Sequence, residues 1–202
     1  MLTFDPKANT ERENYKLLIG TIIPRPIAFV TSIAENGTIN GAPFSYFNIV
    51  SSNPPMISLG LQRREGKMKD TARNILNQKE FVVHIVDEFN VEAINKTAAS
   101  LAPDQSEVEK ANLRLVPSES ISVPGIMEAK VRFECKLEYS LELGEDGNIG
   151  VDLVIGKISR FHVDEEIYES GRINQEKLLA VSRLAGSNYA KVGEVFSIER
   201  PK

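Results

Sequence analysis

The sequence contains one cysteine, two histidines and no tryptophan among 202 residues. A single cysteine cannot form a disulfide within the chain, and so few cysteines and histidines cannot build a closed zinc site from these side chains. No stretch approaches the roughly 18 consecutive apolar residues of a membrane-spanning helix. These absences argue against a disulfide-stabilised scaffold, a zinc-binding module and a helical membrane protein.

Several signatures of common catalytic and nucleotide-binding sites are also missing. There is no Gly-x-Gly-x-x-Gly for a dinucleotide site and no Gly-x-Ser-x-Gly for a serine hydrolase. Residues 60–67 resemble a phosphate-binding loop, but they carry one residue too many before Gly66-Lys67 and are followed by Met68 instead of Ser or Thr. We therefore expect neither a Rossmann site, nor a P-loop, nor a serine nucleophile.

The two histidines, His84 and His162, could still pair with Cys135 to make a nucleophile. Cys135 falls on the apolar face of its predicted strand, where a buried structural thiol is the expected role. His84 lies in an apolar strand and is expected to be a core histidine with satisfied hydrogen bonds. A cysteine-based nucleophile is therefore not expected.

The net charge of −4 gives the chain no global positive field to attract nucleic acid or anionic membrane, so neither is an expected partner. An apolar fraction of 42% is enough for a substantial core and excludes long disorder. The start, MLTFDPKANTERENY, lacks the basic and apolar segments of a secretory signal. We expect a single domain over residues 1–202 and a cytoplasmic, reducing location.

Strands dominate the predicted secondary structure. The clearest pattern covers residues 129–143, where apolar and polar residues alternate, which predicts a strand with one face on a core and one in water. A turn at residues 144–147 leads into a returning strand over 151–163, giving a long hairpin. Asn36-Gly37 is a strong hairpin signal between two further strands. The other predicted strands cover residues 27–33, 38–42, 56–61 and 81–86.

Helices are expected over residues 70–78, 91–101 and 176–184, with a short amphipathic run at 15–19. The strands outnumber the helices and adjoin one another in hairpins. This order predicts a mainly β, antiparallel barrel or sandwich with helices packed outside.

Small polar residues crowd residues 31–53, which also contain three aromatic residues and follow closely after Phe29. Pro43 and Pro54-Pro55 fix the backbone of what is expected to be an irregular loop between two strands. Hydroxyls and amides beside aromatic rings suit a planar, hydrogen-bonding ligand. The alternative is a loop whose polar side chains serve its own turns. The polar residues are Thr31, Ser32, Asn36, Asn40, Ser45, Asn48, Ser51, Ser52 and Asn53.

A second candidate feature is Lys69-Asp70-Thr71 at the start of the helix predicted over 70–78. A helix N-terminus presents unpaired N–H groups and a partial positive charge, so Lys69 and the Thr71 hydroxyl could complete an anion site. The Asp70 carboxylate would repel a phosphate unless Asp70 is the N-cap, in which case its oxygens turn to backbone N–H groups and leave Lys69 and Thr71 facing outward. The alternative is a capped surface helix with solvated lysines.

An ordered set of motifs resembles the flavin reductase-like family over nearly the whole chain. The set begins with PRPIAFVTS at 24–32, NGAPFSYF at 40–47, SSNPP at 51–55 and KDT at 69–71 with Asn74-Ile75. It continues with GKISRFHV at 156–163 and RLAGSNY at 183–189. The resemblance implies an antiparallel split β-barrel of Greek-key type with a few peripheral helices, which binds FMN non-covalently at a homodimer interface.

The resemblance also assigns site residues by position. Thr31 and Ser32 would lie near the flavin ring, with Ser45, Phe47 and Asn48 around the ring and ribityl chain. Ser51, Ser52, Lys69 and Thr71 would hold the phosphate. His162 would lie near the reactive face of the ring as the catalytic candidate, and Arg183 would contact the phosphate or the partner subunit. The alternative for His162 is a strand histidine that pairs with a neighbouring side chain.

The activity implied by the resemblance is hydride transfer from NADH or NADPH to FMN, with reduced flavin supplied to a monooxygenase or other redox partner. Because a flavin carries the redox chemistry itself, no catalytic triad is required. Arg63, Arg64 and Lys67 are candidate contacts for the adenine-ribose end of NADH or NADPH, or else members of a solvated charged loop. Two alternatives remain: an electron-transfer module that does not oxidise nicotinamide, and a cofactor-free interaction protein.

Overall fold

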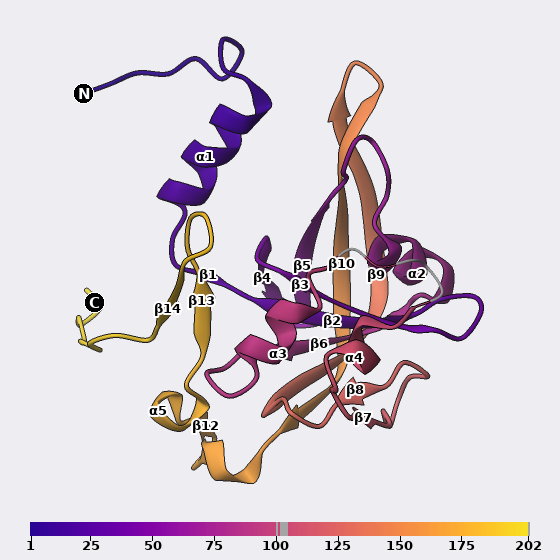
Figure 1. The fold of residues 1–202 in the computed structure, drawn as a ribbon. Coiled ribbons are helices and arrows are strands. Elements are labelled where there is room, and N and C mark those ends of the chain that lie inside the picture. Colours follow the sequence, from indigo (N-terminus) through magenta and orange to yellow (C-terminus); the bar gives the residue numbers. More distant parts are fainter. Residues whose placement is uncertain (100, 102–104, 202) are drawn as a thin grey trace.

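The computed structural model describes residues 1–99, 101 and 105–201 (Figure 1). Its centre is a seven-stranded sheet, antiparallel throughout, in the order β3-β2-β6-β9-β10-β5-β4. The fold is therefore mainly β, as the sequence predicts. The strands are β2 (Ala28–Ile33), β3 (Ile39–Phe44), β4 (Phe47–Ser52), β5 (Pro55–Gln62), β6 (Glu80–Ile85), β9 (Val131–Glu145) and β10 (Asn148–Val163).

The first hairpin, β2–β3, forms at the predicted Asn36-Gly37 turn. Gly37 has a φ of +86°, which favours glycine, and the Ala34 N–H donates to the Thr38 carbonyl at 2.9 Å. Strand β3 also contacts β5, so the sheet curls toward itself.

The second hairpin, β9–β10, is also found where it was predicted, but only half of it covers a core. Near its base, Cys135 and its cross-strand partner Ile158 are buried. Toward its tip the hairpin extends beyond the rest of the sheet (Figure 1), and Tyr139, Leu141 and Leu143 are 69%, 56% and 40% exposed. The expectation that the apolar face of this strand rests on a core is therefore wrong for its second half, because a register shift between Ile155 and Gly156 turns Tyr139 and the apolar residues after it to the face opposite the fully buried Val154.

Two apolar clusters hold the sheet, one on each face. On the face that helix α2 (Asp70–Gln78) covers, which we call the inner face, Leu59 and Phe81 form an inner cluster with Ala72 and Ile75 of the helix. On the other face, Phe29 packs with residues of helices α3 (Val91–Lys96) and α4 (Glu107–Lys110) and of the short ribbon β7 (Leu115–Val116) and β8 (Gly125–Ile126). The helix predicted over 70–78 is confirmed at its exact bounds.

Three elements differ from expectation. Residues 47–52 form the edge strand β4 instead of an irregular loop, because an edge strand tolerates polar residues and unpaired backbone groups. The helix expected over 91–101 ends at Lys96, and part of its predicted end lies outside the described residues. The helix expected over 176–184 is reduced to α5 (Gln175–Leu178), because Leu179 adopts the left-handed conformation with φ +55°.

The two ends of the chain lie on the same side of the main sheet (Figure 1). Helix α1 (Glu11–Thr21) begins at a capping box made by Thr10 and Glu13 and is longer than the run predicted over 15–19. Next to α1 lies a small sheet made of β1 (Arg25–Pro26), β13 (Val181–Arg183) and β14 (Tyr189–Lys191) (Figure 1).

Between β10 and α5 the chain forms a 3-10 turn, η1 (Glu165–Ile167), and the ribbon β11 (Tyr168–Glu169) and β12 (Arg172–Ile173). Across the described part of the chain, no helix combines the length and apolar character needed to cross a membrane.

Candidate functional site

A cavity of about 170 Å³ lies where α1, the small terminal sheet, the corner between β3 and β4, strand β5 and the start of α2 meet. We call it the cation-lined cavity. It is bounded by Tyr15, Ile19, Arg25, Pro43, Phe44, Ser45, Tyr46, Gly60, Gln62, Lys69, Arg183, Leu184 and Gly186.

Three of the lining residues are cationic, namely Arg25, Lys69 and Arg183, and none of the described lining residues is acidic. Arg25 and Arg183 stand directly opposite each other in the ladder between β1 and β13. Like charges placed directly across a sheet repel each other, so an anion bound between them would be stabilising. The charge distribution therefore suits an anionic ligand.

Tyr46 provides a second indication of a ligand. Its hydroxyl is buried and has no hydrogen-bond partner among the described residues. Burial raises the pKa of Tyr46, with Tyr15 also raising it and Arg25 lowering it, so the group is a neutral donor at pH 7. Buried hydroxyls nearly always find a partner. A ligand in the cavity would provide one.

Of the residues predicted for the site, Ser45, Lys69 and Arg183 come together in this cavity from segments far apart in the sequence. Lys69, and not Asp70, is the N-cap of α2, and its side chain makes no capping bond. Asp70 is the first helical residue and pairs with Arg73. The predicted capping role of Asp70 is therefore wrong, although Lys69 is exposed as expected.

Thr71 faces inward, contrary to expectation. It is 2% exposed, and its hydroxyl donates to Asn40 Oδ1 at 2.8 Å. The Asn40 amide donates in turn to Glu107 Oε2 at 2.9 Å, and Ser32 Oγ accepts from Asn74 Nδ2 at 3.2 Å. We call Ser32, Asn40, Thr71, Asn74 and Glu107 the buried amide network. It fixes the first turn of α2 to β2, β3 and α4.

Thr31 is also fully buried, and its hydroxyl donates to the Pro124 carbonyl at 2.7 Å. The hydroxyls of Thr31, Ser32 and Thr71 are thus occupied inside the protein. A direct contact between these hydroxyls and a flavin stays a prediction.

The remaining predicted contacts lie on β4. Phe47 packs partly against the inner cluster, and the Asn48 side chain accepts from the Ile49 N–H. Ser51 Oγ accepts from the Asn53 N–H, and Ser52 is exposed. Ser45 lies in the corner before β4, and the strand rises about 13 Å between Phe47 and Ser51 at about 3.3 Å per residue, so Ser51 lies at the far end of β4 from Ser45.

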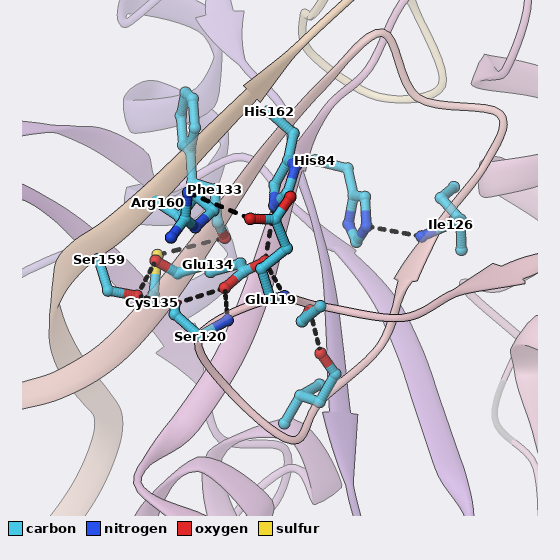
Figure 2. A network of polar contacts seen from close by, with 12 residues as sticks. His84, Glu119, Ser120, Ile126, Phe133, Glu134, Cys135, Ser159, Arg160 and His162 are labelled. Atoms are coloured by element: carbon cyan, nitrogen blue, oxygen red, sulfur yellow. Dashed lines mark hydrogen bonds and ion pairs between the residues drawn. The ribbon is translucent and has the colours of Figure 1, made fainter.

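His162 lies outside the cavity, in a polar cluster shown in Figure 2. Its Nε2 is 2.6 Å from Oε1 of Glu134, which is 1% exposed. The Glu134 carboxylate also accepts from the N–H groups of Glu119 and Ser120, both at 2.7 Å, and from the Ser120 hydroxyl. We call these four residues the Glu134 cluster.

The pKa of Glu134 reflects this environment. Burial raises it, but the hydrogen bonds from Ser120, Glu119 and His162 outweigh burial and bring the pKa down to about 2. Glu134 therefore remains ionised and ties the segment around residues 119–120 to the sheet. The sequence placed Glu134 on the polar side of an alternating strand, where nothing distinguished it from solvated neighbours.

The other candidates behave as structural groups. His84 Nδ1 is 2.9 Å from the Phe29 carbonyl, and its Nε2 accepts from the Ile126 N–H at 3.0 Å (Figure 2). Burial lowers the pKa of His84 to about 3 and raises that of Cys135. The predicted roles of His84 as a satisfied core histidine and Cys135 as a buried thiol are confirmed. In residues 1–99, 101 and 105–201, no cluster of side chains is placed to hold a metal.

The Arg63 side chain already has partners within the protein. Its Nε donates to Asp152 Oδ2 at 3.0 Å, and its guanidinium forms an ion pair with Glu142. Ten of the lining residues were not predicted as site residues, among them Arg25, Tyr46 and Tyr15. Arg25 and Tyr46 lie within the motifs PRPIAFVTS and NGAPFSYF, but nothing in those motifs singles them out, because their proximity depends on strand pairing and on the placement of α1.

Comparison with known proteins agrees with the fold. A model of the flavin reductase like domain matches residues 19–180. The chain is 51% identical to the uncharacterized protein YwrF of Bacillus subtilis over 204 residues, covering all of both.

Solved structures extend this likeness. Nitrilotriacetate monooxygenase component B from Bacillus cereus is 56% identical, with a TM-score of 0.96 and 98% of each chain covered. The Pseudomonas fluorescens 2-nitrobenzoate 2-nitroreductase NbaA is 30% identical, with a TM-score of 0.89, 99% of this chain covered and 96% of the other. The family match spans most of the sequence and the structural likeness spans nearly all of it, so this chain belongs to the flavin reductase-like family.

Proposed function

We propose that the protein is an FMN-dependent flavin reductase that transfers a hydride from NADH or NADPH to FMN. Membership of the family supports a flavin-using oxidoreductase, and relatives named as a monooxygenase component and a nitroreductase agree with redox chemistry. The cavity is the observation that carries the proposal. Among its described lining residues three are cationic and none is acidic, and the buried Tyr46 hydroxyl has no hydrogen-bond partner among the described residues.

The residues present fit one end of FMN. Lys69 and Arg183 would bind the phosphate, Ser45 lies beside them, and the N-terminus of α2 adds its partial positive charge. The Tyr46 hydroxyl would donate one hydrogen bond to the bound group. When bound, FMN supplies the hydride-accepting chemistry, and the protein supplies binding, orientation and a fixed electrostatic environment.

The cavity is too small for the whole cofactor. Ligand pockets typically enclose about 300–1,000 Å³, whereas this cavity encloses about 170 Å³. We therefore infer that the ring lies on an adjoining surface that a second copy of the chain completes. Ser51, Ser52, Phe47 and Asn48 on β4, an edge strand, would then contact flavin at this interface.

The exposed half of the β9–β10 hairpin supports a homodimer. Tyr139, Leu141 and Leu143 stand opposite Ile155, Leu153 and Val151, so these apolar side chains share one face of a two-stranded ribbon. An apolar face of this kind is costly in water and typically marks an association site. Ile49 on β4 is 77% exposed and would extend the contact.

The proposed roles of the other predicted residues follow from their partners. Thr31, Ser32 and Thr71 would act by fixing β2, β3 and the start of α2. Glu134 holds Nε2 of His162, so any contact of His162 with a flavin ring uses Nδ1. We propose one split-barrel domain over residues 1–202, with reduced flavin passed to a monooxygenase or another redox partner.

The test is the visible spectrum of the purified protein with added FMN, recorded anaerobically before and after NADH or NADPH. Binding of FMN with bleaching and steady-state turnover supports the reductase. Bound FMN that neither nicotinamide reduces identifies an electron-transfer module instead. Failure to bind FMN at micromolar concentrations contradicts both.

A further inference from the structure

Arg25 is a buried arginine whose bonds reach both ends of the chain. It is 6% exposed, although arginine is seldom buried without partners. Its guanidinium donates to the carbonyls of Ile19 at 2.8 Å, Ile22 at 2.6 Å and Leu184 at 2.9 Å. Its Nε lies 3.5 Å from Ser45 Oγ. Most of its donors are therefore committed to protein groups, unlike those of Lys69 or Arg183.

The acceptors at the N-terminal side belong to the end of α1. The last carbonyls of a helix lack partners within the helix, and a cation there is favoured by the helix dipole. The last turn of α1 contains no basic residue. Arg25 supplies that cation from outside the helix. Since Ile19 is the one buried residue of α1, apolar packing alone holds this helix weakly.

The acceptor at the C-terminal side is Leu184, the residue after Arg183. Strand β13, which carries Arg183, pairs with β1 through two residues only. The bond from Arg25 to the Leu184 carbonyl therefore reinforces a short ladder at the point where the chain turns toward Gly186. Arg183 itself stacks over the Tyr189 ring, with Cζ at 4.5 Å from the ring centroid.

The two segments that Arg25 contacts, α1 and the chain after β13, both line the cation-lined cavity. Helix α1 contributes Tyr15 and Ile19, and the other segment contributes Arg183, Leu184 and Gly186. Tyr15 and residues 183–186 lie outside the region that matches the family domain. We propose that Arg25 is a positioning residue that assembles the ligand site from the two ends of the chain and sets its preference for a phosphate-bearing flavin. This inference rests on the proposed function, since it places the flavin phosphate in this cavity.

The chemistry of the guanidinium explains why no other side chain can replace it. A planar fork can donate to the end of α1 and to Leu184 at the same time, whereas a lysine ammonium is a compact point charge. In Arg25→Lys the positive charge is kept but the bridge is broken. Arg183 then loses its fixed position, and the part of the affinity that depends on the phosphate falls.

The experiment compares Arg25→Lys and Arg25→Met with the wild type, using FMN and riboflavin, which lacks the phosphate, as probes. Fluorescence titration is expected to show FMN affinity reduced about tenfold or more, the size of one lost charge-assisted contact, with riboflavin affinity nearly unchanged. A variant that merely loosened the fold would weaken both flavins alike, and that result overturns the inference. Arg114→Lys, at an exposed pair with Glu128, is the matched control and should leave both affinities unchanged.

Amide hydrogen exchange gives a readout that does not need flavin. In Arg25→Lys the Ile22 N–H, which donates to the Leu18 carbonyl at the end of α1, should exchange at least about tenfold faster than in wild type. In the wild type, FMN should slow exchange in residues 18–22 and 184–188. Unchanged exchange in the flavin-free variant overturns the inference even if the wild type binds no FMN. Failure of the wild type to bind FMN, with faster exchange in the variant, contradicts the proposed function instead.

A double-mutant cycle tests whether Arg25 acts through Arg183. If it does, Arg25→Lys should have little further effect on the ratio of FMN to riboflavin affinity once Arg183→Gln is present. Full additivity of the two changes would show that Arg25 does not position Arg183. Should Arg25→Met fail to fold, Arg25→Lys and the flavin-dependent exchange of the wild type still decide between these outcomes.

Discussion

The Glu134 cluster and the cation-lined cavity are both built from polar and charged side chains, but they differ in how completely those groups are paired. Glu134 is 1% exposed and accepts hydrogen bonds from Glu119, Ser120 and His162. In the cavity, the Tyr46 hydroxyl has no hydrogen-bond partner among the residues that the structure describes, and two arginines stand opposite each other. A satisfied cluster stabilises the fold, whereas an unsatisfied one has capacity left for a ligand.

The difference separates the roles of residues that look alike in sequence. Lys69 and Thr71 are two positions apart and were both predicted to bind phosphate. Lys69 lines the cavity, while Thr71 belongs to the buried amide network. Substitutions in the satisfied clusters should therefore cost stability, and those in the cavity should cost affinity.

The largest effect is expected from removing two of the cavity cations together. Lys69→Gln with Arg183→Gln should weaken FMN binding by about 3–5 kcal/mol, because each lost charge-assisted bond costs about 1.5–3 kcal/mol. The free energy of unfolding should hold or rise, since the repulsion between Arg25 and Arg183 is relieved. Fluorescence titration and urea unfolding measure the two quantities, and unchanged FMN affinity would contradict the phosphate assignment.

The converse change is Glu134→Gln, which should lower the free energy of unfolding by about 2–4 kcal/mol, as expected when one partner of a buried, hydrogen-bonded charge is lost. The amide places a donor where the carboxylate received donors from Ser120, Glu119 and His162. Glu138→Gln, on an exposed position of the same strand, should change little. Urea unfolding that showed equal stability for the two variants would remove the structural role of the cluster.

The pH dependence of stability offers an independent check on Glu134. Its pKa is about 2 in the folded protein, below the ordinary value of 4.5. The stabilisation is therefore present above about pH 4.5 and is lost as the pH falls through 4.5 toward 2. Between about pH 5 and pH 3, Glu134→Gln should lose less stability than the wild type. Equal losses of stability in the two proteins would show that the partners of Glu134 do not lower its pKa in the folded protein.

Much of the fold could be predicted because its signals are local. Alternation over residues 129–143, the Asn36-Gly37 turn and the amphipathic pattern of 70–78 each lie within one element. Strand β4 was missed because its Ser and Asn residues favour loops, although an edge strand accepts them. Leu179 was missed because nothing in its sequence signals the left-handed conformation that ends α5.

The candidate site could be predicted only in part, for a related reason. Lys69 and Ser45 were found from motifs and from the chemistry of a helix start. Arg25 and Arg183 meet through the pairing of β1 with β13, and α1 brings Tyr15 and Ile19 to the cavity beside Arg25, which donates to the Ile19 carbonyl. The inward orientation of Thr71 depends on Asn40 and on Glu107 in α4, which no local pattern links to the start of α2.

A smaller effect on stability is expected in the buried amide network. Thr71→Val removes the donor to Asn40 Oδ1 while keeping the shape of the side chain, and should cost about 1–2 kcal/mol in the free energy of unfolding. Thr71→Ser keeps the hydroxyl and should recover most of that loss. FMN affinity should change less than in Lys69→Gln. A Thr71→Val protein of normal stability that binds FMN poorly would instead restore Thr71 as a direct ligand.

The smallest change is expected from Tyr46→Phe, and it tests the unsatisfied side of the comparison directly. The hydroxyl has no partner in the described part of the free protein, so its removal should leave the free energy of unfolding unchanged or slightly higher. If the hydroxyl donates to bound FMN, the affinity should fall by about 1 kcal/mol, or about fivefold. Tyr168→Phe, at an exposed position in β11, is the matched control for loss of a phenol. A stability loss in Tyr46→Phe without a change in affinity would mean that the hydroxyl already has a partner in the free protein and belongs with the structural clusters.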